Sequence, residues 1–274
     1  FDWSAWDARF GPLADVSAFA DLPRGKVPTE ALYLPLNENW PMDHEKHFKG
    51  GYWIEHAFGP DYWREFAEAA AGFARHFSEK GWHETMFEFY LNNKVYFKNG
   101  KNGKPGSWKT SYATWIYDEP QHTQDFWAIR RFGEEFWKAA APYGDVRTAF
   151  RIDISRPEWQ RDLLDGVTNV DVVAGVLREY PQRVIGRNRR DGKLTYMYGS
   201  VNKLGQPLVI NAAWCAESWA LGADGVVPWQ TIGTKDSFTK PDDLAVFYPG
   251  PDGPQPSLRL KAFRAGQQLA EYLA

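Results

Sequence analysis

Two adjacent carboxylates, Asp118 and Glu119, follow the apolar stretch 114–117 (Thr-Trp-Ile-Tyr) and precede Pro120. The β-branched and aromatic residues of that stretch predict a buried strand. Pro120 has no N–H for a ladder bond, so the strand should end before it. A pair placed beyond the last strand residue avoids the cost of burying an unpaired charge and is available for acid–base chemistry.

The same pair has a structural interpretation. Asp118 could cap the helix that follows, with Glu119 in the first turn, where the helix dipole favours acids. This stretch alone does not separate capping from chemistry.

Composition bounds the class of protein. The chain has 274 residues, of which 24% are charged and 43% hydrophobic, so it is globular and long enough for one large domain or two small ones. A net charge of −3 and a pI of about 6.1 give no electrostatic case for a nucleic-acid or anionic-membrane partner. No stretch approaches the roughly 18 apolar residues of a membrane span.

Metal and cofactor sites are not predicted. The single cysteine, Cys215, excludes an intrachain disulfide and a cysteine-based metal cluster. His44, His47 and His56 lie near one another in the sequence, but their spacing matches no ligand pattern, and we interpret them as loop histidines.

Hydrophobic periodicity predicts helices and strands that alternate along the chain. Helices are predicted over 61–80, 123–141, 159–164, 207–221 and 257–273. Strands are predicted over 30–36, 85–91, 114–117, 146–154, 170–176, 194–199 and 224–229. Residues 1–30 contain two Gly/Pro clusters and are expected to hold little regular structure.

This alternation predicts an α/β fold with a parallel sheet and crossover helices. A closed (β/α)₈ TIM-type barrel has eight strands and typically about 250 residues, whereas seven strands are predicted here. The remaining strand either lies within residues 1–30 or is missing from this chain. No internal repeat or long linker is visible, so a single barrel domain over 1–274 is expected.

In such barrels the active site is built from residues that follow the carboxyl ends of the strands. These positions are rich in carboxylate, amide and aromatic groups, which suit the hydroxyls and the apolar faces of a sugar, so a carbohydrate (glycan or glycoconjugate) substrate is expected. For Trp40 and Trp229 a core position is the alternative. The candidate substrate-binding residues are Glu38, Asn39, Trp40, Asn92, Asn93, Lys94, Tyr117, Arg151, Asp153, Tyr198 and Trp229, beside Asp118 and Glu119.

Four groups of residues form longer motifs. They are 33–41 (Tyr-Leu-Pro-Leu-Asn-Glu-Asn-Trp-Pro), 89–94 (Phe-Tyr-Leu-Asn-Asn-Lys), 117–120 (Tyr-Asp-Glu-Pro), and a tail made of 248–254 (Tyr-Pro-Gly-Pro-Asp-Gly-Pro), 257–260 (Ser-Leu-Arg-Leu) and 264–266 (Arg-Ala-Gly). Together they resemble glycoside hydrolase family 123 and its uncharacterised relatives, over nearly the whole chain.

This resemblance implies a (β/α)₈ barrel with retaining β-N-acetylgalactosaminidase activity and substrate-assisted catalysis. It implies that Asp118 holds and polarises the 2-acetamido group and that Glu119 is the general acid/base. Family members usually carry a β-sandwich and a first barrel strand ahead of the position where this chain begins. The chain is therefore expected to be a fragment of a longer protein, secreted or periplasmic, whose signal peptide lies outside this sequence.

The geometry of adjacent residues favours the same mechanism. A conventional retaining pair flanks the sugar with its carboxyls about 5–5.5 Å apart. Neighbouring residues, whose Cα atoms lie about 3.8 Å apart, approach from one side, which suits one acid and one group that steers an internal nucleophile.

Two alternatives stay open. One is a conventional two-carboxylate glycosidase acting on another sugar, which would pair Glu119 with Asp153, Glu38 or Glu217. The other is a non-catalytic carbohydrate-binding barrel, in which the adjacent carboxylates only cap a helix.

Overall fold

The computed structural model of the chain describes residues 1–22, 26–50, 53–92 and 115–274. They group into two compact units. The first unit comprises residues 1–152 and 159–169, and the second comprises residues 153–158 and 170–274. The predicted single domain over 1–274 stays a prediction.

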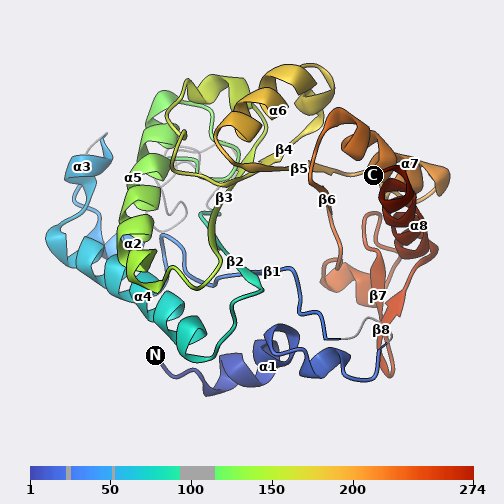
Figure 1. Cartoon of the computed structure of the whole chain (residues 1–274), viewed down its shortest axis with the longest axis horizontal. Helices are drawn as coiled ribbons and strands as arrows, with labels where there is room; N and C mark the ends of the chain where they lie inside the picture. The colour runs from blue at the N-terminus through green and yellow to red at the C-terminus, as the bar shows by residue number, and fades with distance from the viewer. Residues whose placement is uncertain (23–25, 51–52, 93–114) are drawn as a thin grey trace. The chain divides into compact units, whose positions relative to one another are not determined.

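The first unit begins with a helix and then alternates strands and helices (Figure 1). Its elements are α1 (Ser4–Ala14), η1 (Ser17–Phe19), β1 (Ala31–Tyr33), α2 (His44–His47), α3 (Ile54–Ala57), α4 (Pro60–Glu79), β2 (Met86–Tyr90), α5 (Thr123–Ala140) and η3 (Ala141–Tyr143). Two further elements, β3 (Thr148–Ile154) and η4 (Pro157–Gln160), have residues in both units.

Strands β1, β2 and β3 pair in parallel, with Ala31 opposite Met86 and Phe87 opposite Thr148. Helices α4 and α5 lie side by side in Figure 1. The core between these elements is aromatic, and burial of each Phe contributes about 1.5–3 kcal/mol. Its fully buried phenylalanines are Phe66, Phe73, Phe77, Phe87, Phe89, Phe126, Phe132, Phe136 and Phe150.

One glycine permits the close approach of α5 to the sheet. A Cβ at Gly133 would overlap the side chains of Phe150 on β3 and Val167. Any larger residue there would therefore push α5 away from the strand.

The second unit repeats the alternation and ends in a hairpin and a long helix. Its elements are β4 (Val170–Val173), η5 (Gly175–Arg178), α6 (Pro181–Arg190), β5 (Leu194–Gly199), α7 (Val209–Leu221), β6 (Gly225–Pro228), η6 (Lys235–Phe238), β7 (Phe247–Gly250), β8 (Gly253–Pro256) and α8 (Leu258–Leu273). Strands β4, β5 and β6 pair in parallel, whereas β7 and β8 pair antiparallel.

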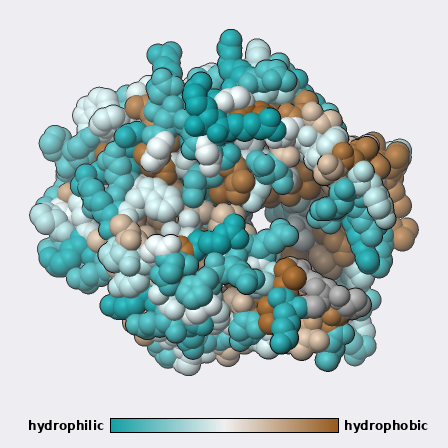
Figure 2. Space-filling model, in the orientation of Figure 1, coloured by the Kyte–Doolittle hydropathy of each residue, from teal (hydrophilic) through white to brown (hydrophobic). Residues whose placement is uncertain are grey.

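Helices α7 and α8 pack tightly because Gly266 lacks a side chain. A Cβ at that position would lie 2.5 Å from the Ala212 carbonyl oxygen and 2.9 Å from the Cys215 Cβ. Apolar surface gathers near these two helices in Figure 2. Val209 on α7 and Leu258 and Leu269 on α8 are exposed.

The six parallel strands with alternating helices fit a partial (β/α)₈ barrel, as predicted. The strands expected at 85–91 and 194–199 and the helices expected at 61–80 and 123–141 are confirmed as β2, β5, α4 and α5, with end residues shifted by at most one. The predictions for β1, β3, β4, β6, α7 and α8 are also confirmed, over shorter spans.

The strand predicted at 114–117 is wrong over its described residues, 115–117, which are buried but belong to no strand. Thr114 lies outside the described residues. The backbone N–H of Ile116 donates to the Asp125 carboxylate, 3.0 Å away, instead of to a neighbouring strand. A buried apolar run therefore contributes packing here without a sheet ladder.

The prediction of an irregular segment over 1–30 is also wrong, because α1 occupies Ser4–Ala14 even though it includes Gly11-Pro12. Tertiary contacts stabilise this helix. Trp3 stacks on His76 of α4 with a centroid distance of 4.0 Å, and Asp7 pairs with His76 and Lys80 at 2.7 and 2.6 Å. No strand precedes β1 among the described residues of this segment.

Other local predictions failed for simpler reasons. The helix expected at 159–164 is the short η4, which ends at Gln160 and continues as turns. Helix α6 was not predicted, because its sequence, Pro-Gln-Arg-Val-Ile-Gly-Arg-Asn-Arg-Arg, has only two large apolar residues. The proline-rich hairpin of β7 and β8 also escaped prediction, since proline is generally depleted in strands.

In the described part of the chain, no helix is long and apolar enough to cross a membrane. The same residues contain no group of three or more His, Cys, Asp or Glu side chains that could hold a metal ion.

Candidate active site

The adjacent carboxylates lie in a bend that follows the buried residues 115–117. Asp118 and Glu119 are both half-buried. Glu119 has a φ of 59°, in the left-handed region that costs an L-residue about 1–2 kcal/mol. Residues held in such conformations cluster at functional sites, so the bend is a candidate for chemistry.

The bend is closed by Asp125, in the first turn of α5. Its Oδ1 accepts the N–H of Ile116 at 3.0 Å. Its Oδ2 accepts the N–H groups of Gln121 at 3.0 Å and His122 at 2.8 Å. One buried carboxylate thus joins both ends of the segment 116–122.

This arrangement excludes the helix-capping interpretation of the adjacent carboxylates. Helix α5 begins at Thr123 and its N-cap residue is His122. The acid in its first turn is Asp125. Asp118 is therefore not the cap, and Glu119 precedes the first turn.

The loop after β1 positions Glu38. Asn37 and Trp40 exchange two backbone hydrogen bonds, of 3.1 and 3.4 Å, and the Asn37 side chain accepts the Asn39 N–H at 2.8 Å. The Tyr62 hydroxyl donates to the Glu38 carbonyl oxygen at 2.8 Å. Glu38 is fully buried, and its carboxylate accepts a 3.4 Å hydrogen bond from the Asn39 amide.

Tyr117 lies close to Glu38, so the structure brings two predicted site residues together. Burial raises the pKa of the Tyr117 phenol well above its usual value, and the nearby Tyr62, Glu38 and Asp125 raise it further. Both tyrosines therefore stay protonated, since burial and Glu38 also raise the pKa of Tyr62. The Tyr117 hydroxyl has no hydrogen-bond partner among the described residues.

Arg151 lies beside the end of β2, in a buried pair with Glu88. Its Nη1 donates to the Glu88 carboxylate at 3.1 Å. The guanidinium also lies over the rings of Tyr33 and Tyr90, at 4.7 and 5.4 Å from their centroids. Alternate strand residues thus form one layer of charged and aromatic groups on β1, β2 and β3.

Asn92, two residues beyond β2, is exposed. The other two predicted residues of that loop, Asn93 and Lys94, lie outside the described residues.

In the second unit, the predicted residues Asp153, Tyr198 and Trp229 come from three strand ends. The Tyr198 hydroxyl lies 2.9 Å from the Ser155 hydroxyl. The Trp229 N–H donates to the Gly199 carbonyl oxygen at 2.9 Å. Asp153 is half-buried, whereas Trp229 is 55% exposed and thus available to a ligand.

Two further residues of the prediction have other surroundings. The Trp40 ring packs against Phe1 and Phe73, at centroid distances of 5.6 and 6.2 Å, and is 43% exposed. Glu217, a candidate second carboxylate, lies on α7, and both its oxygens bind Arg178, at 2.6 and 2.8 Å. This bidentate pair lowers the pKa of Glu217, which disfavours a proton-donating role.

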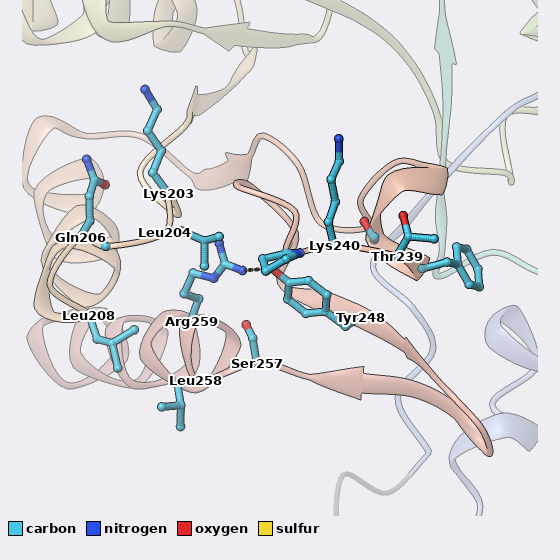
Figure 3. Close-up of a pocket in the computed structure, with 14 residues that line it drawn as sticks. Lys203, Leu204, Gln206, Leu208, Thr239, Lys240, Tyr248, Ser257, Leu258 and Arg259 are labelled. Carbon is cyan, nitrogen blue, oxygen red and sulfur yellow. Dashed lines mark hydrogen bonds between the residues drawn. The ribbon is translucent and has the colours of Figure 1, made fainter.

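A cavity of about 680 Å³ lies in the second unit, and none of the predicted site residues line it. The Arg259 guanidinium, shown in Figure 3, donates to the Tyr248 hydroxyl at 2.7 Å and to the carbonyl oxygens of Asn202 and Asp243. Lys203 and Lys240 extend away from it in the same view. The Arg259 guanidinium therefore joins the loop that contains Asn202 to the loop that contains Asp243.

Sequence reasoning missed three residues of the first unit that shape the site: Tyr62, Glu88 and Asp125. Glu88 carried a signal, because a lone acid inside an apolar strand requires a partner. Tyr62 and Asp125 resembled ordinary helix residues, and no local pattern marked their long-range hydrogen bonds.

No protein-family model matches the sequence, and comparison with curated proteins finds no match. Among solved structures, the chain is similar to one titled "Structure of GH113 beta-1,4-mannanase". The TM-score is 0.42 and the identity 11%, over 81% of this chain and 67% of that chain. The resemblance to glycoside hydrolase family 123 stays a prediction.

Proposed function

We propose that this chain is a glycoside hydrolase domain that releases terminal β-linked N-acetylhexosamine, with N-acetylgalactosamine as the favoured sugar. The reaction retains the anomeric configuration and is substrate-assisted, and Asp118 and Glu119 are its catalytic residues. The observation that carries this proposal is the bend at 118–119. It holds two adjacent carboxylates, half-buried and outside the cap of α5, one of them in a left-handed conformation.

In the proposed reaction Glu119 donates a proton to the departing glycosidic oxygen. The 2-acetamido oxygen attacks the anomeric carbon as the C–O bond breaks, which forms an oxazolinium ion. Asp118 holds the acetamido N–H and stabilises the positive charge that develops there. Glu119 then takes a proton from a water molecule as that water attacks the anomeric carbon. This attack opens the oxazolinium ring and gives overall retention of configuration.

Adjacent placement supports this division of roles. Both carboxylates reach the substrate from one bend, so they cannot flank the sugar as a conventional retaining pair does. An internal nucleophile held near the anomeric carbon gains an effective molarity that water cannot match. Amide side chains near the strand ends of the first unit, among them Asn39, would contact the sugar.

The test compares two aryl glycosides that differ only at C2. We expect 4-nitrophenyl β-N-acetylgalactosaminide to be cleaved and 4-nitrophenyl β-galactoside to be inert. Progressive fluorination of the acetamido methyl should lower the rate with each fluorine, because it weakens the attacking oxygen. Comparable hydrolysis of the galactoside would rule out substrate assistance and favour a two-carboxylate mechanism. Binding without turnover of either glycoside would favour a carbohydrate-binding domain.

A further inference from the structure

The carboxylate of Asp125 has an unusual set of partners for an acid in the first turn of a helix. Such acids commonly accept N–H groups at their own helix end. Asp125 accepts the His122 N–H in this way, but it also accepts the N–H groups of Ile116 and Gln121. The bonds to Ile116 and Gln121 enclose residues 117–120, which include both proposed catalytic carboxylates.

Asp125 is a rigid anchor for that segment. It is 1% exposed, and the next turns of its helix bury Phe126, Ile129 and Phe132 in the aromatic core. The helix dipole also favours a negative charge at this position. The bend cannot move far without breaking a bond to a group that is itself fixed.

We propose that Asp125 is a positioning residue, which sets the geometry of the Asp118–Glu119 pair without touching the substrate. This inference rests on the proposed function for its catalytic consequence, but the positioning itself is a property of the backbone. It assigns to Asp125 a task that a helix cap alone would not have.

Carboxylate chemistry explains why the residue is Asp. Both oxygens accept, one from the Ile116 side and the other from the Gln121 and His122 side. An Asn side chain has the same shape but only one accepting oxygen, and its NH₂ group would face an N–H donor. We therefore expect Asp125→Asn to keep the hydrogen bond at one end of the segment, either to Ile116 or to Gln121 and His122, and to lose the bond at the other end.

The experiment measures amide hydrogen exchange and steady-state kinetics for Asp125→Asn in the full chain. A matched control is Ala128→Gly, one turn further along α5, where Ala128 is fully buried. We expect Asp125→Asn to increase exchange by about tenfold or more at Ile116, or at Gln121 and His122, relative to the control. On the N-acetylgalactosaminide, kcat should fall about 100-fold while KM changes little, because misplacement by about 1 Å has an effect of that size. At temperatures below the melting temperature of the Ala128→Gly protein, we expect its kcat to equal that of the wild type.

Failures of the two proposals are distinguishable. An inactive wild-type protein would overturn the proposed function, and positioning would then be judged by exchange and by the backbone chemical shifts of Asp118 and Glu119. Unchanged exchange and shifts in Asp125→Asn would overturn positioning, as would an unchanged kcat in an active protein. If Asp125→Asn does not fold, Gln121→Pro removes the Gln121 N–H donor and leaves the carboxylate in place. Its readouts are exchange at Ile116 and His122, the backbone chemical shifts of Asp118 and Glu119, and kcat.

Discussion

Each unit contains a buried charge near the start of a helix that closes loops through backbone groups. In the first unit the Asp125 carboxylate accepts three N–H groups, whereas in the second the Arg259 guanidinium donates to two carbonyl oxygens and the Tyr248 hydroxyl. Arg259, the second residue of α8, carries a positive charge where the helix dipole disfavours one. Its hydrogen bonds must offset that cost, while the dipole favours Asp125.

The two charges differ in what they hold. Asp125 fixes a strained bend that contains two carboxylates, and Arg259 fixes the carbonyl groups of Asn202 and Asp243, which are outside the predicted site. A buried charged group is therefore a poor marker of a functional site by itself. A buried charged group has a positioning role when the segment that it holds carries candidate catalytic side chains. It has a purely structural role when that segment carries none.

The largest expected difference is in catalytic activity. It is between a substitution in the segment that Asp125 holds and a substitution in the segment that Arg259 holds. Glu119→Gln should lower the rate on substrates with poor leaving groups by about 10²–10⁴-fold and affect activated aryl glycosides less, because an activated oxygen needs little protonation. Asp243→Asn, in the segment that Arg259 holds, should leave kcat unchanged. Initial rates on both kinds of substrate provide the measurement, and equal losses on both would remove Glu119 from the acid role.

An intermediate effect is expected from Arg259 itself. Arg259→Met removes the guanidinium donors to the carbonyl oxygens of Asn202 and Asp243 and to the Tyr248 hydroxyl. It should lower the free energy of unfolding by at least about 3 kcal/mol, since hydrogen bonds to charged groups are worth about 1.5–3 kcal/mol each. Arg259→Lys keeps the charge but not the fork of donors, so it should recover only part of that loss. Urea unfolding of the three proteins measures both effects. A loss below about 1 kcal/mol in Arg259→Met would show that these bonds add little to stability.

The smallest expected effect is a pH dependence of the free energy of unfolding that arises in the first unit and not from Arg259. His44, in the first unit, packs against Phe58 at a centroid distance of 4.9 Å, and its burial lowers its pKa to about 3. The unfolded chain takes up a proton near pH 6.5, so the stabilisation from neutral His44 is complete above that pH and is lost as pH falls towards 3. At pH 5 the loss is about 2 kcal/mol.

The matching measurement is the free energy of unfolding at pH 7.5 and pH 5 for the wild type and His44→Leu. The variant should show a smaller decrease between the two pH values, because it lacks the group that protonates on unfolding. Arg259 stays charged throughout this range, so its replacement should leave the pH dependence unchanged. Equal pH dependence in wild type and His44→Leu would contradict the prediction.

The sequence by itself determined the elements whose apolar residues repeat with a helical or strand period. For α4, the apolar stripe and the flanking Gly59-Pro60 and Gly81 indicate both the helix and its ends. Strand β2 shows the same for a short run of large apolar residues. These patterns predict the elements correctly because the residues that form the buried face of a helix or strand lie close together in the chain. The adjacency of Asp118 and Glu119 is likewise a fact of the sequence.

Tertiary structure alone decided which distant groups meet. Glu88 and Arg151 lie 63 positions apart, and their pairing depends on the parallel register that sets Tyr90 opposite Arg151. For Ile116, either a strand ladder or a carboxylate nine residues away would satisfy the N–H, and the residues of 114–117 suit both. The carboxylate is its partner because α5, fixed by its aromatic face, places Asp125 at hydrogen-bonding distance. Burial requires that a polar group find a partner, but only the assembled fold determines which partner is within reach.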